Sequence, residues 1–155
     1  MKLDMGCGLQ KRDGFIGVDP YIETDYRVPM WKVPLPDGCA DEIASFHSLE
    51  HVPQAQVMPC LREWHRLLAP DGMLTIEVPN LDYVAWYWLN GSDRDWAQQL
   101  MFGNQQHEGE FHECGFSKDD LAKVIIDAGF ALQNIGIVWD YNQESILAVA
   151  TKVQE

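Results

Sequence analysis

The sequence predicts an α/β fold: an open, mostly parallel sheet with helices packed on it. After residue 40, short apolar segments typical of buried strands alternate with helix-like segments, the order that produces such sheets. The chain has 155 residues, enough for one domain with a substantial core. We therefore predict a single domain over residues 1–155, with its ligand beyond the C-terminal ends of the strands.

The first forty residues hold short strands and little room for helices. Residues 2–5 and 15–19 are predicted strands, and the second ends at an aspartate. Residues 9–14 between them allow barely one helical turn, whereas a parallel crossover normally takes about a dozen residues. Four prolines within residues 20–36 exclude a long helix but permit a brief strand near 25–28. The first two crossovers are therefore expected to be shortened.

The middle of the chain alternates strand, helix and strand. The apolar run 41–47 fits a buried parallel strand, although periodicity alone also allows a helical turn. A helix follows, because apolar residues recur at helical spacing up to the Pro-Asp-Gly stop at 70–72. These apolar residues are Leu61, Trp64, Leu67 and Leu68. Residues 73–79 are rich in β-branched side chains and are the next predicted strand.

The last third begins with a segment of different character. Residues 81–114 hold three of the six tryptophans and are interpreted as an insertion. A helix then starts at Ser117, which can cap it together with Asp120, and it stops at Gly129. Two closing strands are expected near 132–139 and 145–152.

Charge and cysteine content exclude several classes of partner. Lysine and arginine total 11 against 24 acidic residues, a net charge of −13, so binding to nucleic acid or to anionic membranes is not expected. No apolar stretch reaches the roughly 20 residues that a bilayer span requires. The four cysteines form no C-x-x-C pair, and no signal-peptide pattern precedes the first strand. A cytoplasmic protein with free thiols is predicted.

The turn after the first strand is the strongest sign of a ligand. Gly6 and Gly8 flank Cys7, and glycines let backbone N–H groups approach a ligand closely. A dinucleotide site would have a third glycine where Lys11 stands, and an acidic residue farther along than Asp19. S-adenosylmethionine makes smaller demands: a glycine turn for its amino-acid tail and a carboxylate for its ribose hydroxyls.

Four linked segments resemble the successive motifs of class I S-adenosylmethionine-dependent methyltransferases, in particular the small members of that family. They are LDMGCG, GFIGVD, LPDGCADEIASFHSLEHV and REWHRLLAPDGMLTIEVPN. The segment FHECGFSKDDLAKVIIDAGF is similar to the C-terminal helix region of the same family. The resemblance implies a Rossmann-like sheet of seven strands, helices on both faces and an antiparallel last strand.

The resemblance also implies a set of cofactor-binding residues. The first turn would hold the methionine part, Asp19 the ribose, and the stretch at Met30 and Trp31 the adenine. The end of the strand at 41–47 would line the pocket near the sulfonium. The expected cofactor-binding residues are Asp4, Gly6, Cys7, Gly8, Asp19, Met30, Trp31, Ser45, Phe46 and His47. Cys7 is expected to pack and not to act as a nucleophile.

The predicted reaction is methyl transfer to a small soluble acceptor. Candidate general bases are His47, His107 and His112. A non-catalytic S-adenosylmethionine-binding module is the alternative. A zinc hydrolase is a third possibility, since residues 47–51 match the pattern H-x-x-E-H. That pattern requires both histidines on one helix and a distant third ligand. No metal is therefore predicted. A second subunit, or the insertion, is expected to cover the sheet where the crossovers are short, which makes a homodimer a hypothesis.

Overall fold

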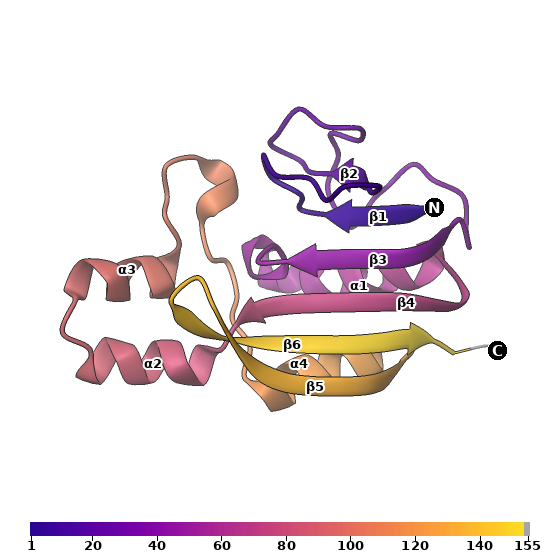
Figure 1. Cartoon of the computed structure of the whole chain (residues 1–155). Helices are drawn as coiled ribbons and strands as arrows, with labels where there is room; N and C mark the ends of the chain where they lie inside the picture. Colours follow the sequence, from indigo (N-terminus) through magenta and orange to yellow (C-terminus); the bar gives the residue numbers. More distant parts are fainter. Residues whose placement is uncertain (154–155) are drawn as a thin grey trace.

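The computed structural model describes residues 1–153 and contains one six-stranded sheet in the order β2-β1-β3-β4-β6-β5 (Figure 1). The strands are β1 Lys2–Met5, β2 Ile16–Val18, β3 Ala40–Phe46, β4 Leu68–Pro79, β5 Phe130–Asp140 and β6 Gln143–Lys152. The helices are α1 Val57–Leu67, α2 Leu81–Asn90, α3 Arg94–Phe102 and α4 Lys118–Asp127. Short 3₁₀ turns are η1 Leu49–His51, η2 Gln54–Gln56 and η3 Glu108–Glu110.

The sheet confirms the predicted α/β, Rossmann-like class. Strands β2, β1, β3 and β4 pair in parallel, and β6 runs antiparallel to both β4 and β5. The last strand is therefore antiparallel, as expected. The predicted strand boundaries are close to those observed, except that β4 starts before the Pro-Asp-Gly turn at 70–72.

The expected seventh strand is absent from the described residues, which is a correction to the prediction. Its place is taken by one parallel bridge between Val18 and Tyr26. The prolines of residues 20–36 account for this, because each removes a backbone donor and restricts the residue before it. No helix forms in the connections 6–15 and 19–39, so the first two crossovers are shortened as predicted.

The two crossover helices lie on the same face of the sheet, a more one-sided arrangement than the expected helices on both faces. Figure 1 shows α1 behind β3 and β4, and α4 behind β5 and β6. Trp64 and Leu61 of α1 join Ile125 of α4 in one core, where all three side chains have no exposed surface. The opposite face carries no helix among residues 1–153. Near β1 it is covered by the β1–β2 loop, whose Arg12 guanidinium lies 3.7 Å from the Phe46 ring centroid.

Helix α4 begins with the predicted capping box. The Ser117 hydroxyl accepts from the Asp120 amide, and the Asp120 carboxylate accepts from the Ser117 amide. Losing a serine cap typically costs about 1 kcal/mol. We expect Ser117→Ala to lower the free energy of unfolding by about that amount in urea denaturation. Lys118→Ala, in the same turn, should change it by less than about 0.5 kcal/mol, and equal losses in the two variants would contradict the capping role.

An ion pair within α1, between Glu63 and Arg66, forms hydrogen bonds with the long β2–β3 loop. Glu63 binds Arg66 and accepts from the Val33 amide at 2.8 Å, while Arg66 donates to the Leu35 carbonyl at 2.8 Å. The Arg66 hydrogen bond lowers the pKa of Glu63 from 4.5, against the opposing effect of burial. These contacts fasten the loop that carries Met30 and Trp31.

This ion pair predicts a pH dependence of stability. Because the folded-state pKa is lowered, the stabilisation is present above pH 4.5 and is lost as the pH falls through the folded-state value. We expect Glu63→Gln to lower the free energy of unfolding by about 1.5 kcal/mol at pH 7 and by much less near pH 3. Chemical denaturation at the two pH values measures this, and a loss independent of pH would contradict it.

Candidate active site

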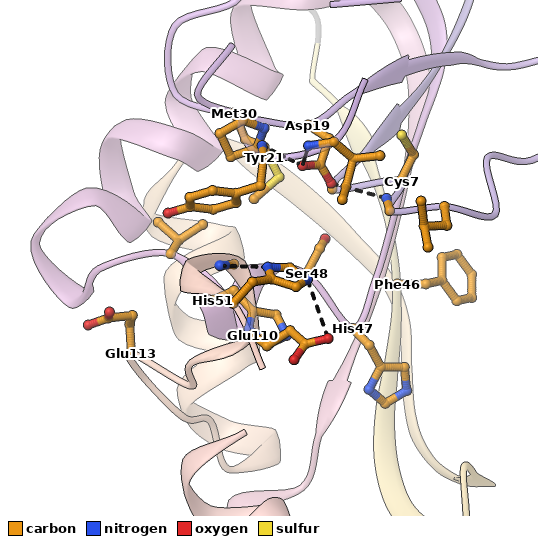
Figure 2. A pocket seen from close by; sticks show the side chains of 18 of the residues that line it. Cys7, Asp19, Tyr21, Met30, Phe46, His47, Ser48, His51, Glu110 and Glu113 are labelled. Carbon is orange, nitrogen blue, oxygen red and sulfur yellow. Dashed lines mark hydrogen bonds and ion pairs between the residues drawn. The ribbon is translucent and has the colours of Figure 1, made fainter. Parts of the chain in front are cut away.

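A cavity of about 470 Å³ opens beyond the C-terminal ends of β1, β2 and β3 (Figure 2). Eight of the ten expected cofactor residues line it: Gly6, Cys7, Gly8, Asp19, Met30, Trp31, Phe46 and His47. Asp4 and Ser45 do not. The structure thus places most of the expected site residues around one space at the predicted edge of the sheet.

The glycine turn forms one wall of this cavity. Gly6 has a φ of 68°, and a Cβ built there would lie 2.3 Å from the Cβ of Ser48, so only glycine fits. Gly8 has a φ of 54°. Burial raises the pKa of the Cys7 thiol between them, which favours the protonated, unreactive form.

Asp19 lies at the tip of β2 with its carboxylate turned toward the glycine turn. One oxygen accepts from the amides of Tyr21 and Ile22 at 2.8 and 3.0 Å, and the other accepts from the Gly8 amide at 3.0 Å. A carboxylate offers about four acceptor positions. In this arrangement Asp19 fixes the shape of the turn and has room for about one ligand hydroxyl, fewer than the two that the sequence suggested.

The two remaining expected residues support the cavity wall from behind. Asp4 accepts a hydrogen bond from the Arg12 amide at 2.8 Å and so closes the loop that follows the glycines. Ser45 is fully buried, and its hydroxyl lies 2.6 Å from that of Ser48, which itself donates to the Met5 carbonyl. Ser48 also lines the cavity, and no sequence motif had marked it as a site residue.

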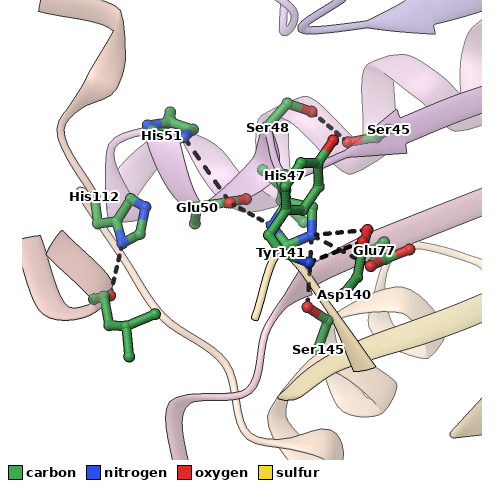
Figure 3. A network of polar contacts seen from close by, with 12 residues as sticks. Ser45, His47, Ser48, Glu50, His51, Glu77, His112, Asp140, Tyr141 and Ser145 are labelled. Carbon is green, nitrogen blue, oxygen red and sulfur yellow. Dashed lines mark hydrogen bonds and ion pairs between the residues drawn. The ribbon is translucent and has the colours of Figure 1, made fainter. Parts of the chain in front are cut away.

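His47 lines the cavity and lies between carboxylates of different elements (Figure 3). Its Nδ1 is 3.5 Å from Glu50 Oε1, and its Nε2 is 3.2 Å from Glu77 Oε1. Burial opposes the charged imidazole, but the hydrogen bonds with the two glutamates outweigh it and raise the pKa of His47 to about 9. These contacts favour the charged imidazole, which is a cation and has no lone pair to accept a proton.

A second cavity of about 420 Å³ adjoins the first. Its walls come from the insertion, through His112 and through Trp96 and Leu100 of α3, and from Glu50 and Gln143. Four residues line both cavities: His47, His51, Glu110 and Tyr141. The insertion thus forms part of the wall of an open cavity beside the predicted cofactor cavity.

The three candidate bases lie in different places. His47 lines both cavities, and His112 lines the second. His107 lines the first cavity, and its side chain is half-exposed. The Nδ1 of His107 accepts a hydrogen bond from the Gly109 amide at 3.1 Å. The Nδ1 of His112 lies 3.1 Å from the Leu100 carbonyl, which can only accept, so Nδ1 carries the proton and Nε2 has a free lone pair.

Several lining residues had no counterpart in the prediction. Tyr141 packs edge-on against the His47 ring, with centroids 4.8 Å apart. It belongs to the two-residue turn between β5 and β6, where Tyr141 and Asn142 have φ of 46° and 60°. Such turns usually contain glycine, which is absent here, so the sequence did not mark this hairpin. Tyr21 and Glu113 also line the first cavity and carry no motif of their own.

Within residues 1–153, none of the helices combines the length and the apolar composition needed to cross a lipid bilayer.

A family model described as a methyltransferase domain matches residues 3–135. A comparison with curated protein sequences finds no match. The H-x-x-E-H pattern does not form the helix of a zinc hydrolase, because His47 precedes the short turn η1 that carries Glu50 and His51. The zinc-hydrolase alternative is therefore wrong, because both the local structure and the family match contradict it.

Solved methyltransferase structures share the fold. An S-adenosylmethionine-dependent methyltransferase of Methanosarcina mazei has a TM-score of 0.70 at 15% identity, covering 99% of this chain and 92% of its own. One from Mesorhizobium loti has a TM-score of 0.69 at 17% identity, covering 97% and 90%. The 1,6-didemethyltoxoflavin-N1-methyltransferase of Burkholderia thailandensis, crystallised with that acceptor and S-adenosylhomocysteine, has a TM-score of 0.67 at 16% identity, covering 99% and 71%.

The family match covers the glycine turn, Asp19 and every residue that lines the two cavities except Tyr141 and Gln143, and the fold agrees with it. The chain therefore belongs to the class I S-adenosylmethionine-dependent methyltransferases.

Proposed function

We propose that this methyltransferase acts on a small molecule bound in the second cavity, with S-adenosylmethionine in the first. The observation that carries the proposal is the shared wall: His47, His51, Glu110 and Tyr141 border both cavities. An acceptor in the second cavity would therefore face the cofactor's methyl group across these residues. Methyl transfer is an in-line displacement, and holding the two reactants in line supplies roughly 7–11 kcal/mol of catalysis.

Each part of the first cavity suits one part of the cofactor. The bare backbone of Gly6 and Gly8 suits the amino-acid tail, and Asp19 suits one ribose hydroxyl. Met30 and Trp31 form the wall proposed for the adenine. The bound cofactor supplies an electrophilic methyl group on a sulfonium. The residues of the chain position the cofactor. The glycine turn, which Ser48 and Asp19 hold in place, determines where the methyl group lies.

The charge of the second cavity favours neutral or cationic acceptors. Glu50, Glu110 and Asp140 lie in or beside its wall, and the whole chain carries a net charge of −13. His47 is the cation among them, and two glutamates already neutralise it. An anionic acceptor would face uncompensated carboxylates.

Replacing Asp19 tests the cofactor assignment. We expect Asp19→Ala to weaken S-adenosylmethionine binding by roughly 1.5–3 kcal/mol, the usual scale for a hydrogen bond to a charged group. Calorimetric titration measures this, with NAD as the ligand that should not bind and Asp13→Ala, in the exposed β1–β2 loop, as the matched variant. Unchanged affinity in Asp19→Ala would place the ribose elsewhere.

Product formation separates an enzyme from a binding module. Incubation with S-adenosylmethionine and a panel of hydroxyl and amine acceptors should release S-adenosylhomocysteine. Cofactor binding with no release on any acceptor would favour the non-catalytic module instead.

We also propose that a second copy of the chain covers the helix-free face of the sheet. Met73 of β4 projects from this face with 38% of its surface exposed, and partly buried Val149 of β6 lies diagonally across from it. Light scattering at micromolar concentration should then report a dimer that Met73→Glu dissociates. A monomeric wild-type protein would contradict this proposal.

A further inference from the structure

We propose that Glu50, His51 and His112 form a binding site for a divalent transition-metal ion in the wall of the second cavity. One ligand atom from each of the three residues lies within 4.8 Å of the other two (Figure 3). The metal site itself does not depend on the proposed function. The role given to the ion below rests on the proposed function.

The three side chains already stand close to a coordinating arrangement. Glu50 Oε1 and His51 Nε2 are 3.9 Å apart, and the rings of His51 and His112 meet edge to face with centroids 5.0 Å apart. A tetrahedral ion with bonds of about 2.1 Å separates its ligand atoms by about 3.4 Å. Small side-chain rotations would therefore suffice to close the set around an ion.

Both histidines are held in the tautomer that a metal requires. His51 Nδ1 lies 2.8 Å from the Phe111 carbonyl, and His112 Nδ1 lies 3.1 Å from the Leu100 carbonyl. Since a carbonyl only accepts, each Nδ1 is the donor and each Nε2 keeps its lone pair. Metal-binding histidines in proteins typically donate their second nitrogen to a carbonyl or carboxylate in this way. The insertion supplies both carbonyls, so its folding against η1 orients the site.

Unpartnered buried oxygens point independently to a missing ligand. Glu50 is 2% exposed, yet its Oε2 has no hydrogen-bond partner among residues 1–153. The Oε1 of Gln143, a residue 7% exposed, is likewise without a partner in the described chain, and it lines the same cavity as Glu50. Buried polar atoms are nearly always satisfied, and an ion is one common reason for an exception. An ion on Glu50, with water or substrate reaching Gln143, would satisfy both.

The donor set selects the kind of ion. Two imidazoles and one carboxylate suit Zn²⁺ and its first-row neighbours, whereas Mg²⁺ and Ca²⁺ prefer all-oxygen sites. Three protein ligands leave a coordination position open, as in catalytic zinc sites. Because all three ligands line the second cavity, the open position would face the bound acceptor.

An ion at this position would bind an oxygen of the acceptor, which deepens the proposed function to O-methylation. Coordination lowers the pKa of a bound hydroxyl. The acceptor O–H then loses its proton to solvent, the oxygen forms a bond to the methyl carbon, and the C–S bond breaks. The products are a methyl ether, S-adenosylhomocysteine and one proton.

Titration with Co²⁺ tests the site in the full chain. After treatment with a chelator, the protein should bind one equivalent of Co²⁺ with the visible absorption of a low-coordinate nitrogen–oxygen site. The variants His51→Gln, His112→Gln and Glu50→Gln should each bind about 100-fold more weakly while keeping the wild-type circular dichroism spectrum. His65→Gln, on α1 outside the cluster, is the matched control and should bind like the wild type.

The outcomes separate this inference from the proposed function. No Co²⁺ uptake, or uptake that the three variants leave unchanged, would overturn the metal site even if the protein methylates an acceptor. Should a variant lose its circular dichroism spectrum, its conservative partner, His112→Cys or Glu50→Asp, is expected to retain partial Co²⁺ binding. Stoichiometric binding together with transfer to amines but never to hydroxyls would overturn the assigned acceptor class.

Discussion

Replacing Gly6 with alanine is expected to lower the affinity for S-adenosylmethionine by more than 100-fold. Two effects combine at this position. Gly6 has a φ of 68°, where an L-residue costs roughly 1–2 kcal/mol, and the new Cβ would lie 2.3 Å from the Cβ of Ser48. Ser48 cannot withdraw easily, because its hydroxyl is bound to Met5 and Ser45 in the core. The glycine turn itself must therefore move, and the amino-acid tail of the cofactor loses its contacts with the backbone of this turn.

Gly14 provides the matched control. Its φ is 79°, similar to that of Gly6, but a Cβ built there meets no atom within 4 Å. Gly14→Ala therefore incurs the backbone cost without the collision, and its cofactor affinity should stay close to that of the wild type. Calorimetry on both variants separates the two effects. Binding by Gly6→Ala within about threefold of the wild type would show that the turn does not hold the cofactor.

Trp64→Ala should have the largest effect on stability. Trp64 has no exposed surface and packs at the centre of the core shared by α1, α4 and the sheet. Truncating a buried tryptophan typically costs about 3–5 kcal/mol, a large fraction of the 5–15 kcal/mol that stabilises an ordinary domain. Its Nε1 also donates to the Met30 carbonyl at 3.1 Å, so the same change frees the loop at the proposed adenine wall.

Urea denaturation measures the effect of Trp64→Ala, with Trp86→Ala as the comparison. Trp86 is 56% exposed on α2, and its loss should change the free energy of unfolding by less than about 0.5 kcal/mol. Equal losses in the two variants would contradict the central place of Trp64 in the core. Trp64→Phe, which keeps most of the volume but not the donor, should fall between them.

Features with a local signature were predictable from the sequence. The capping box at Ser117, the apolar stripe that includes Trp64, and the glycine turn at Gly6 each depend on residues close together in the chain. The composition of the apolar segments predicted where the strands lie, and the order of the motifs indicated the family. For these features, local propensity and tertiary structure agree.

Features that depend on distant contacts were not predictable. His51 and His112 are far apart in the sequence, and only the folding of the insertion brings their rings together. Carboxylates on two different elements contact His47 and favour its charged form, which its sequence neighbours did not indicate. The hairpin at Tyr141 has no glycine, so its positive φ values follow from the pairing of β5 and β6. The number of strands depended on whether the proline-rich loop could pair.

The position of β6 in the sheet has a consequence for biosynthesis. Residues 143–152 fill the place between β4 and β5, so the strand that leaves the ribosome after all the others is an interior one. Until β6 has emerged, the edge of β4 in the growing polypeptide stays unpaired, and the hydrophobic core cannot be completed. The sheet therefore cannot be completed before β6 has left the ribosome, and until then that open edge is the surface that a chaperone would have to shield from other nascent chains.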